Sequence, residues 1–153
     1  MCYANILKQN DKEKSAQKIL EKSIKENPSG TYKRYFELGE IYHGVEAIKT
    51  FETGIVEAFK NLKNPFKTVT PEGEIKRDIA QAYATIAEIC MTDLVDEPQA
   101  EGKCTEALEK GVKMDGKCMD VHLQVANYQL FKDNFEIAGS ELSIILAAVK
   151  AKE

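Results

Sequence analysis

The sequence is poor in the residues that build metal and redox centres. It has four cysteines and two histidines in 153 residues, with no C-x-x-C spacing and no close pair of histidines. Structural metal sites and redox motifs need such clusters, so we expect no metal site. The start of the chain also lacks the basic and apolar segments of a secretory signal. We therefore expect reduced thiols in a protein of the cytoplasm, with the nucleus as the alternative.

Long hydrophobic runs and an excess of positive charge are missing too. No apolar run approaches the roughly 18 residues of a membrane-spanning helix, so we expect no membrane partner. Lysine and arginine number 21 against 25 acidic residues, and the net charge is -4. Nucleic-acid binding usually needs a clustered basic surface, so direct binding to DNA or RNA is not expected. An acidic chain instead favours basic proteins or peptides as partners.

The usual signatures of catalysis are also missing. The sequence has no phosphate-binding loop, no H-E-x-x-H and no G-x-S-x-G. A pair of carboxylates such as Glu40 and Glu88 could in principle do acid–base chemistry, but nothing in their spacing requires it. We predict a protein that is not an enzyme and uses no cofactor.

Helical periodicity fills most of the chain, and strand-like alternation is scarce. Asp11 and Asp133 stand where helix N-caps are expected, and Thr70-Pro71 followed by acidic residues is typical of a helix start. The length favours one domain covering residues 1–153. The expected helices have approximate bounds 2–9, 12–26, 31–43, 45–60, 71–95, 97–113, 117–131 and 134–150.

Two segments carry the spacing of a known helical repeat. "YFELGEIY" at 35–42 matches the W-x2-L-G-x2-Y offsets of a first tetratricopeptide helix, and "AIKTFETGI" at 47–55 matches those of the second. "AQKILEKSIKENP" at 16–28 fits the second half of an earlier repeat. We predict an all-α, tetratricopeptide-repeat-like superhelix of about 3.5–4 stacked antiparallel helix pairs. An array of α-hairpins without true repeat geometry is the alternative.

The order of three segments adds a more specific resemblance. A shortened repeat "GVEAIKTFETGI" is followed by "EICMTDL" and "AEGKC" at 88–104, and then by "VHLQVANYQL" at 121–130. This order resembles the fungal and other eukaryotic tetratricopeptide chaperones dedicated to the ribosomal protein uL4, although Cys90 stands where an aromatic residue is usual. The resemblance implies a protein that binds the long basic internal loop of newly made uL4 during large-subunit assembly and shields it.

The first helices of such an array line its concave groove, and their inward offsets give candidate partner-binding residues. Glu40, Glu88 and Asn127 share one repeat position, which predicts a row along the groove. Carboxylates beside apolar side chains suit an arginine-rich segment, because the acid meets the guanidinium while the stem lies on apolar surface. The predicted partner-binding residues are Phe36, Glu37, Glu40, Glu88, Met91, Asp93, Asp120, Leu123 and Asn127.

Structural roles compete with these assignments. Phe36 and Met91 could equally fill the core, and the groove acids could simply be solvated. His43 and His122 are expected to pack or cap helices, and the region around Glu136 and Glu141 is expected to be a solvated outer face.

Two other binding functions are open to this fold. A co-chaperone clamp for acidic heat-shock tails needs lysine, asparagine and arginine in the groove, and here the charge at Glu40 and Glu88 has the wrong sign. A generic scaffold or adaptor module of a larger complex fits the fold equally well.

Overall fold

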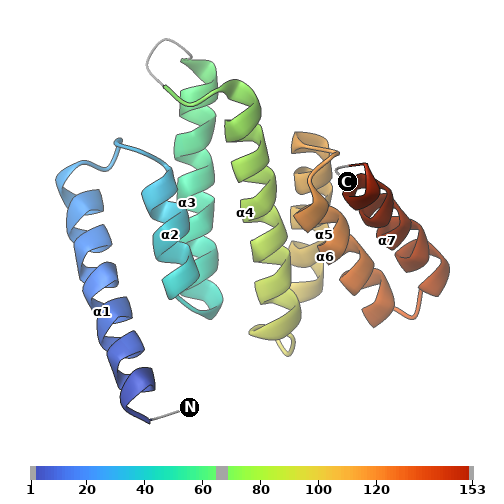
Figure 1. Cartoon of the computed structure of the whole chain (residues 1–153), viewed down its shortest axis with the longest axis horizontal. Coiled ribbons are helices and arrows are strands. Elements are labelled where there is room, and N and C mark those ends of the chain that lie inside the picture. The colour runs from blue at the N-terminus through green and yellow to red at the C-terminus, as the bar shows by residue number, and fades with distance from the viewer. Residues whose placement is uncertain (1–2, 65–68, 152–153) are drawn as a thin grey trace. The chain divides into compact units, whose positions relative to one another are not determined.

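The computed structural model describes residues 3–64 and 69–151, with side chains from residue 11 onward. Within these residues the chain is all-helical and has no strand, which confirms the predicted fold class (Figure 1). The helices are α1 (Tyr3–Glu26), α2 (Lys33–Ile41), α3 (Gly44–Lys63), α4 (Glu72–Thr92), α5 (Ala100–Met114), α6 (Met119–Phe131) and α7 (Phe135–Lys150).

The chain divides into two compact units, residues 1–63 and residues 64–153. Helices α1 to α3 form the first unit, and α4 to α7 form the second. One leading helix followed by three helix pairs agrees with the expected 3.5 to 4 pairs. The expectation of a single repeat domain over residues 1–153 stays a prediction.

The break expected before residue 12 does not exist. Residues 3–26 form one continuous helix, and Asp11 lies inside it instead of capping a second helix. The surrounding "KQNDKEK" contains neither glycine nor proline, and the Ser15 hydroxyl donates a hydrogen bond of 2.8 Å to the Asp11 carbonyl one turn earlier. An aspartate without a helix-breaking neighbour is therefore insufficient to start a new helix here.

Arg34 of α2 ties the end of α1 to the first helix pair. Its guanidinium donates hydrogen bonds to the carbonyl of Ser23 at 2.8 Å and to the carbonyl of Asn27 at 2.6 Å. Both carbonyls also accept a backbone N–H, from Asn27 and Gly30 respectively, and the cation adds charge-assisted bonds at the negative end of the helix dipole. The Tyr35 hydroxyl donates to the Pro28 carbonyl at 2.9 Å, which fixes the same junction.

Helices α2 and α3 pack closely at two glycines. A Cβ at Gly39 would lie 2.8 Å from the Phe51 ring, and a Cβ at Gly54 would lie 2.7 Å from the Phe36 ring. The Phe36 and Phe51 rings are stacked, with their centroids 6.0 Å apart. The two helices are joined by only residues 42 and 43, and Gly44 takes a positive φ of 55° at the corner. Glycine adopts this conformation without steric cost, so the shortened repeat predicted from sequence closes here.

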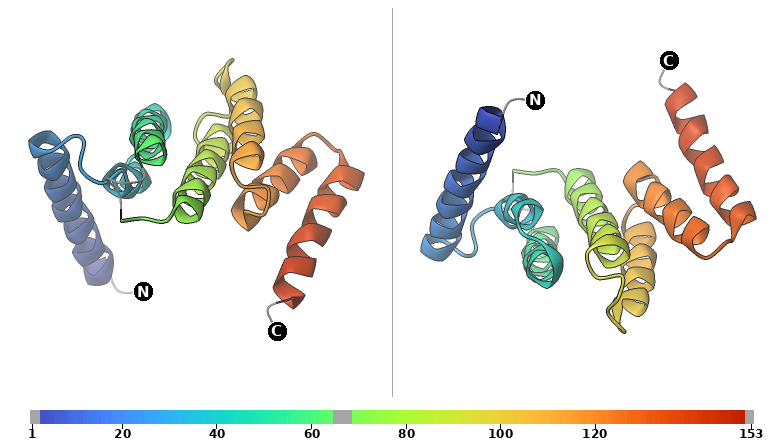
Figure 2. Two further views of the ribbon diagram at one scale, coloured as in Figure 1. Left: turned by 90° about the horizontal axis from the view of Figure 1, so that it is seen from above. Right: turned by 90° about the horizontal axis from the view of Figure 1, so that it is seen from below.

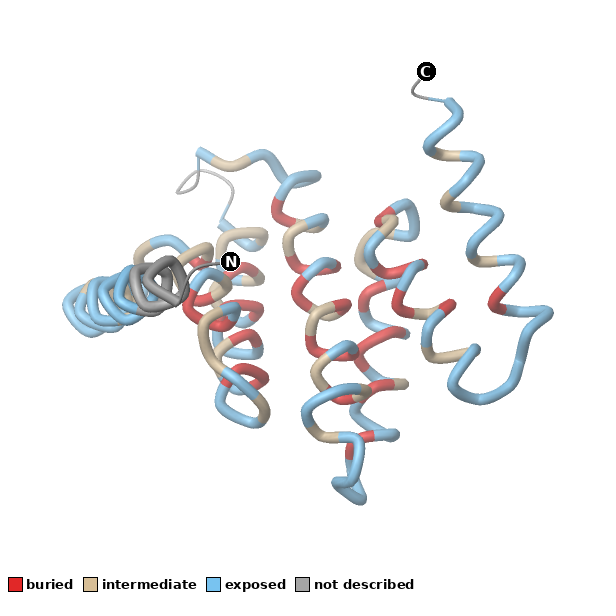
Figure 3. Tube along the Cα trace, turned by 60° about the horizontal axis from the view of Figure 1, so that its bottom comes forward, coloured by how far each residue is buried: buried red, intermediate tan, exposed pale blue. Residues whose placement is uncertain are grey.

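The second unit packs α6 against α4 and α5. Ala80 and Ala84 of α4, with Cys118 and Val121 beside them, form a buried cluster. Gly111 of α5 lets Val121 approach, since a Cβ there would lie 3.1 Å from the valine side chain. Figure 3 shows buried residues following the helix faces within each unit. Small residues on α4 and α5 thus leave room for the next helix pair.

Helix α7 returns alongside α6 after a tight turn (Figure 2). Asp133, expected as an N-cap, instead takes a positive φ of 59° in this turn, and Asn134 precedes the helix. A short polar side chain tolerates the left-handed conformation better than most residues do.

A buried histidine joins α6 to α7. His122 Nδ1 lies 2.6 Å from Glu141 Oε2, and His122 Nε2 lies 2.9 Å from the Gly116 carbonyl oxygen. Glu141 is therefore half-buried against α6, and the expectation that it belongs to a solvated outer face is wrong. Burial lowers the pKa of His122, but the hydrogen bonds to Glu141 and Gly116 outweigh it and the pKa is raised.

We expect Gly54→Ala to destabilise the protein by about 1–3 kcal/mol, because the new Cβ overlaps the Phe36 ring. Gly139→Ala is the matched control: nothing lies within 4 Å of its Cβ position, so better helix propensity should stabilise the protein by about 0.5–1 kcal/mol. Urea unfolding followed by circular dichroism measures both. If the two substitutions change the free energy of unfolding equally, α2 and α3 do not approach as closely at Gly54 as described.

We expect the His122–Glu141 pair to stabilise the protein below about pH 6.5, the ordinary pKa of histidine. Because the folded-state pKa is raised, this contribution is lost as the pH rises through that pKa. The difference in unfolding free energy between the parent and His122→Gln should therefore shrink between pH 6 and pH 8. His43→Gln, at an exposed position, controls for loss of a histidine. If the difference in unfolding free energy stays constant with pH, the pair with Glu141 does not raise the pKa of His122 in the folded protein.

Candidate partner-binding surface

Polar side chains link α4 and α6; Gln124 among them is buried, whereas Gln81, Glu88, Asp120 and Asn127 are exposed. Gln81 Nε2 donates to Asp120 Oδ2 at 2.7 Å, and Gln124 Nε2 donates to Glu88 Oε2 at 3.3 Å. Asn127 Nδ2 donates to Gln124 Oε1 at 3.2 Å. We call the surface that these side chains share with exposed Leu123 the α4–α6 face; it comprises Gln81, Glu88, Asp120, Leu123, Gln124 and Asn127.

The two carboxylates of the α4–α6 face are bonded to amides. Each accepts a hydrogen bond from a neutral amide, and neither forms an ion pair in the described part of the chain. A carboxylate has about four acceptor positions, so both retain capacity for a further donor. Leu123 is 42% exposed and offers apolar surface three residues after Asp120 on the same helix. The face therefore combines two oriented negative charges with an apolar contact.

Six of the nine predicted partner-binding residues lie in this second unit. Glu88, Asp120, Leu123 and Asn127 belong to the α4–α6 face. Met91 is half-buried in the last turn of α4, and Asp93 follows as its exposed C-cap residue. Glu88 and Asn127 both bond to Gln124, so two members of the predicted row are neighbours.

The other three predicted residues lie on α2 in the first unit. Phe36 is half-buried and contacts Tyr32 and Phe51, so it packs the first helix pair together. Glu37 and Glu40 are exposed. Partner contact by these residues, and the place of Glu40 in the predicted row, stay predictions.

A cavity that the sequence reasoning missed lies beside the corner between α4 and α5. Its volume is about 300 Å³. Its wall is apolar at Met91, Val95, Pro98 and Phe131, and its charged lining residues are Asp96, Glu97, Glu101 and Lys132. The corner, the end of α4, the start of α5 and the end of α6 line the cavity, so no single stretch of sequence reveals it.

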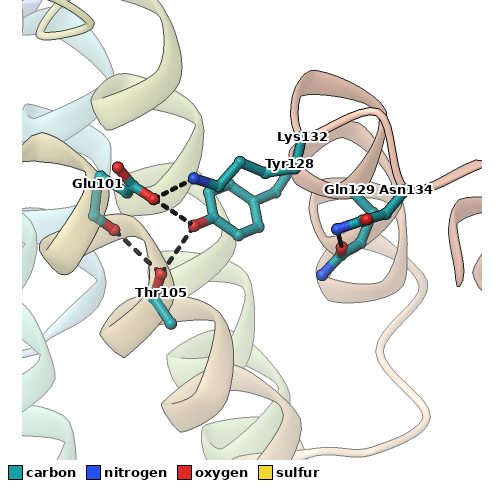
Figure 4. A network of polar contacts seen from close by, with 6 residues as sticks. All are labelled: Glu101, Thr105, Tyr128, Gln129, Lys132 and Asn134. Carbon is teal, nitrogen blue, oxygen red and sulfur yellow. Dashed lines mark hydrogen bonds and ion pairs between the residues drawn. The ribbon is translucent and has the colours of Figure 1, made fainter.

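A polar network crosses one side of this cavity (Figure 4). Lys132, just after α6, forms an ion pair with Glu101 in the first turn of α5. The Tyr128 hydroxyl lies 3.5 Å from Glu101 Oε1, and the Thr105 hydroxyl donates to Tyr128 Oη at 3.1 Å. The bond to Lys132 lowers the pKa of Glu101 and raises the pKa of Lys132, which favours both charged forms.

The three described cysteines are packing residues. Cys90, Cys104 and Cys118 are buried and form no disulfide, whereas Cys2 lies outside the described residues. Burial raises the pKa of Cys104 to about 12 and also raises the pKa of Cys118, so both are neutral thiols. Among the described residues, no group of three or more metal-ligating side chains comes together. None of the described helices is both long and apolar enough to cross a membrane.

Comparisons with known proteins agree with this picture. No family model matches the chain. A curated protein of the fission yeast Schizosaccharomyces pombe, named "Probable assembly chaperone of rpl4", is 26% identical over 119 residues, which cover 77% of this chain and 34% of the relative. A solved structure of an "Assembly Chaperone of RpL4", residues 1–338, matches 94% of this chain with a TM-score of 0.78 at 16% identity.

The chain spans about a third of the curated relative's length and 58% of the solved chain. The solved structure supports the fold alone, since sequence identity with it is low. The resemblance expected from the segment order is confirmed: the chain is similar in sequence to a probable assembly chaperone of rpl4, and in fold to a solved chaperone of the same description.

Proposed function

We propose that this chain is an assembly chaperone that binds newly made ribosomal protein L4, called uL4 above. The observation that carries the proposal is the sequence similarity to the fission-yeast protein, which extends over 77% of this chain. A similarity of this extent covers most of the described helices and not one short motif. The role is one of binding and needs no catalysis.

The α4–α6 face is suited to the basic internal loop that the resemblance assigns as the bound segment. A guanidinium presents a planar fork of donors that matches a carboxylate, here Glu88 or Asp120. The aliphatic stem of the same arginine can lie on exposed Leu123. The neutral amides of Gln81 and Gln124 already orient the carboxylates, so less side-chain freedom is lost on binding.

A scaffold module is the second candidate, and one surface favours it. Between α5 and α6 a mainly apolar hollow of about 380 Å³ is lined by Leu108, Val112, Val125 and Tyr128. Exposed apolar hollows of this kind are common at protein–protein contacts. A scaffold would use this hollow and would be indifferent to the charge of the α4–α6 face.

We expect Glu88→Lys to weaken binding of uL4 about tenfold, or about 1.4 kcal/mol, because it replaces an attractive charge with a repulsive one. Glu52→Lys makes the same charge change at an exposed position of α3 and should have a much smaller effect. Isothermal titration calorimetry with purified uL4 measures both dissociation constants. If the two variants bind alike, the α4–α6 face is not the contact, and the hollow between α5 and α6 becomes the better candidate.

We expect deletion of the internal loop of uL4 to abolish its capture by this chain on co-expression. Binding of intact uL4 should weaken as salt rises from about 0.1 M to about 0.5 M, because exposed charges are then screened over shorter distances. Equal recovery of intact and loop-deleted uL4 would exclude the loop as the bound segment. Failure to capture intact uL4 would exclude the chaperone function itself.

The proposed function also predicts where in the cell the chain is found. We expect the chain in the cytoplasm, where uL4 is made, with the nucleus as the alternative. Fluorescence microscopy of a tagged chain in its native cell distinguishes the two.

A further inference from the structure

We propose that the cavity beside the α4–α5 corner is a pocket for one arginine or lysine side chain of the bound basic segment. We further infer that Lys132 takes the place of this cation in the free protein. The inference rests on the proposed function, since it names a second contact for the same ligand. It concerns only residues of the second unit.

The lining of the cavity matches a long cationic side chain. Met91, Val95 and Pro98 form apolar surface on which methylene groups can lie. Tyr128 and Phe131 add aromatic rings, which attract cations. A volume of about 300 Å³ lies at the small end of ligand pockets. This size favours a single side chain over a cofactor.

The charged groups that line the cavity are mainly negative, which favours a bound cation. Three carboxylates, those of Asp96, Glu97 and Glu101, line it together with one ammonium group, that of Lys132. The side chains of Asp96 and Glu97 form no hydrogen bond or ion pair within the described part of the chain. Two negative charges therefore remain after Lys132 has neutralised Glu101, and an incoming cation would be attracted.

The Lys132–Glu101 ion pair is easily exchanged. The Lys132 side chain is 39% exposed and the Glu101 side chain is 65% exposed, so water competes for both. Exposed ion pairs stabilise a protein little, so a guanidinium with its two parallel donors can displace the lysine. The Tyr128 hydroxyl contacts the Glu101 carboxylate independently of Lys132, and the Thr105 hydroxyl, which donates to the Glu101 backbone carbonyl, also donates to Tyr128 (Figure 4). The Tyr128 hydroxyl would therefore still be in contact with the carboxylate when the lysine leaves.

The pocket continues the α4–α6 face toward the ends of both helices. Met91 lies three residues after Glu88, and Phe131 lies four residues after Asn127, so each is about one helical turn, or about 5.4 Å, farther along. Side chains two residues apart in an extended peptide are about 6–7 Å apart. A basic segment with one cation at Glu88 can thus place its next cation on the same side in the pocket.

We expect Lys132→Gln to tighten binding of uL4 by three- to tenfold, because it removes the ammonium group that competes with the ligand for Glu101. Glu101→Gln should weaken binding about fivefold, because the acceptor becomes neutral. Lys103→Gln is the matched control, as it removes an exposed lysine two residues from Glu101 that does not line the cavity. Titration calorimetry gives the dissociation constants, and circular dichroism checks that each variant is folded.

A small probe tests the pocket apart from uL4. N-acetyl-arginine amide should shift the backbone amide signals of residues 95–101 and 128–132 in a heteronuclear NMR spectrum. The shifts should be larger in Lys132→Gln and smaller in Glu101→Gln. These results would support the pocket even if uL4 itself were not captured.

The pocket and the chaperone function fail in different ways. If Lys132→Gln and Lys103→Gln bind uL4 alike while Glu88→Lys still weakens binding, the pocket is wrong and the proposed function stands. If the parent chain does not bind uL4, the proposed function fails, and the arginine probe alone decides the pocket. Absence of any shift at residues 95–101 and 128–132 would overturn it.

Discussion

Paired helices in this protein come closer than side chains normally allow, and glycine makes that approach possible. At Gly39 and Gly54 the space that a Cβ would need is filled by the rings of Phe51 and Phe36. Each ring thus packs against the backbone of the opposite helix, so the pair has little freedom to slide or rotate. Gly111 plays a similar part toward Val121 in the second unit. In the second unit this contact joins α5 to α6, the helix that carries Asp120, Leu123 and Asn127 of the α4–α6 face.

The repeat offsets predicted much of the fold because they report this packing directly. The spacing of the repeat puts Gly39 on a first helix and Phe51 on a second helix, and in the structure the Phe51 ring packs against Gly39. The shared repeat position predicts a row of Glu40, Glu88 and Asn127, and Gln124 bonds to the last two. The continuity of α1 and the burial of Glu141 were missed, because local propensity does not reveal tertiary partners. Lys132 and Glu101 are 31 residues apart, so helical spacing could not pair them.

Carboxylates are held in two chemically different ways on the second unit. Neutral amides orient Glu88 and Asp120 and leave their charge available. An ammonium group neutralises Glu101 and must leave before the charge can serve another cation. The first arrangement favours rapid attraction of a basic ligand, since its field is present from the outset. The second favours selectivity, since only a cation that outcompetes Lys132 gains the contact.

Most helix contacts join neighbours in the chain, so the helices can pack while the chain is being synthesised. Apart from α4 with α6, the substantial helix contacts within each unit join helices that follow one another in the chain. Proteins rich in such local contacts close short loops first and fold fast, often within milliseconds. Helix α3 can pack on α2 as soon as both have left the ribosome, before the second unit has been synthesised. A protein proposed to receive another newly made chain would then itself be ready soon after its own synthesis.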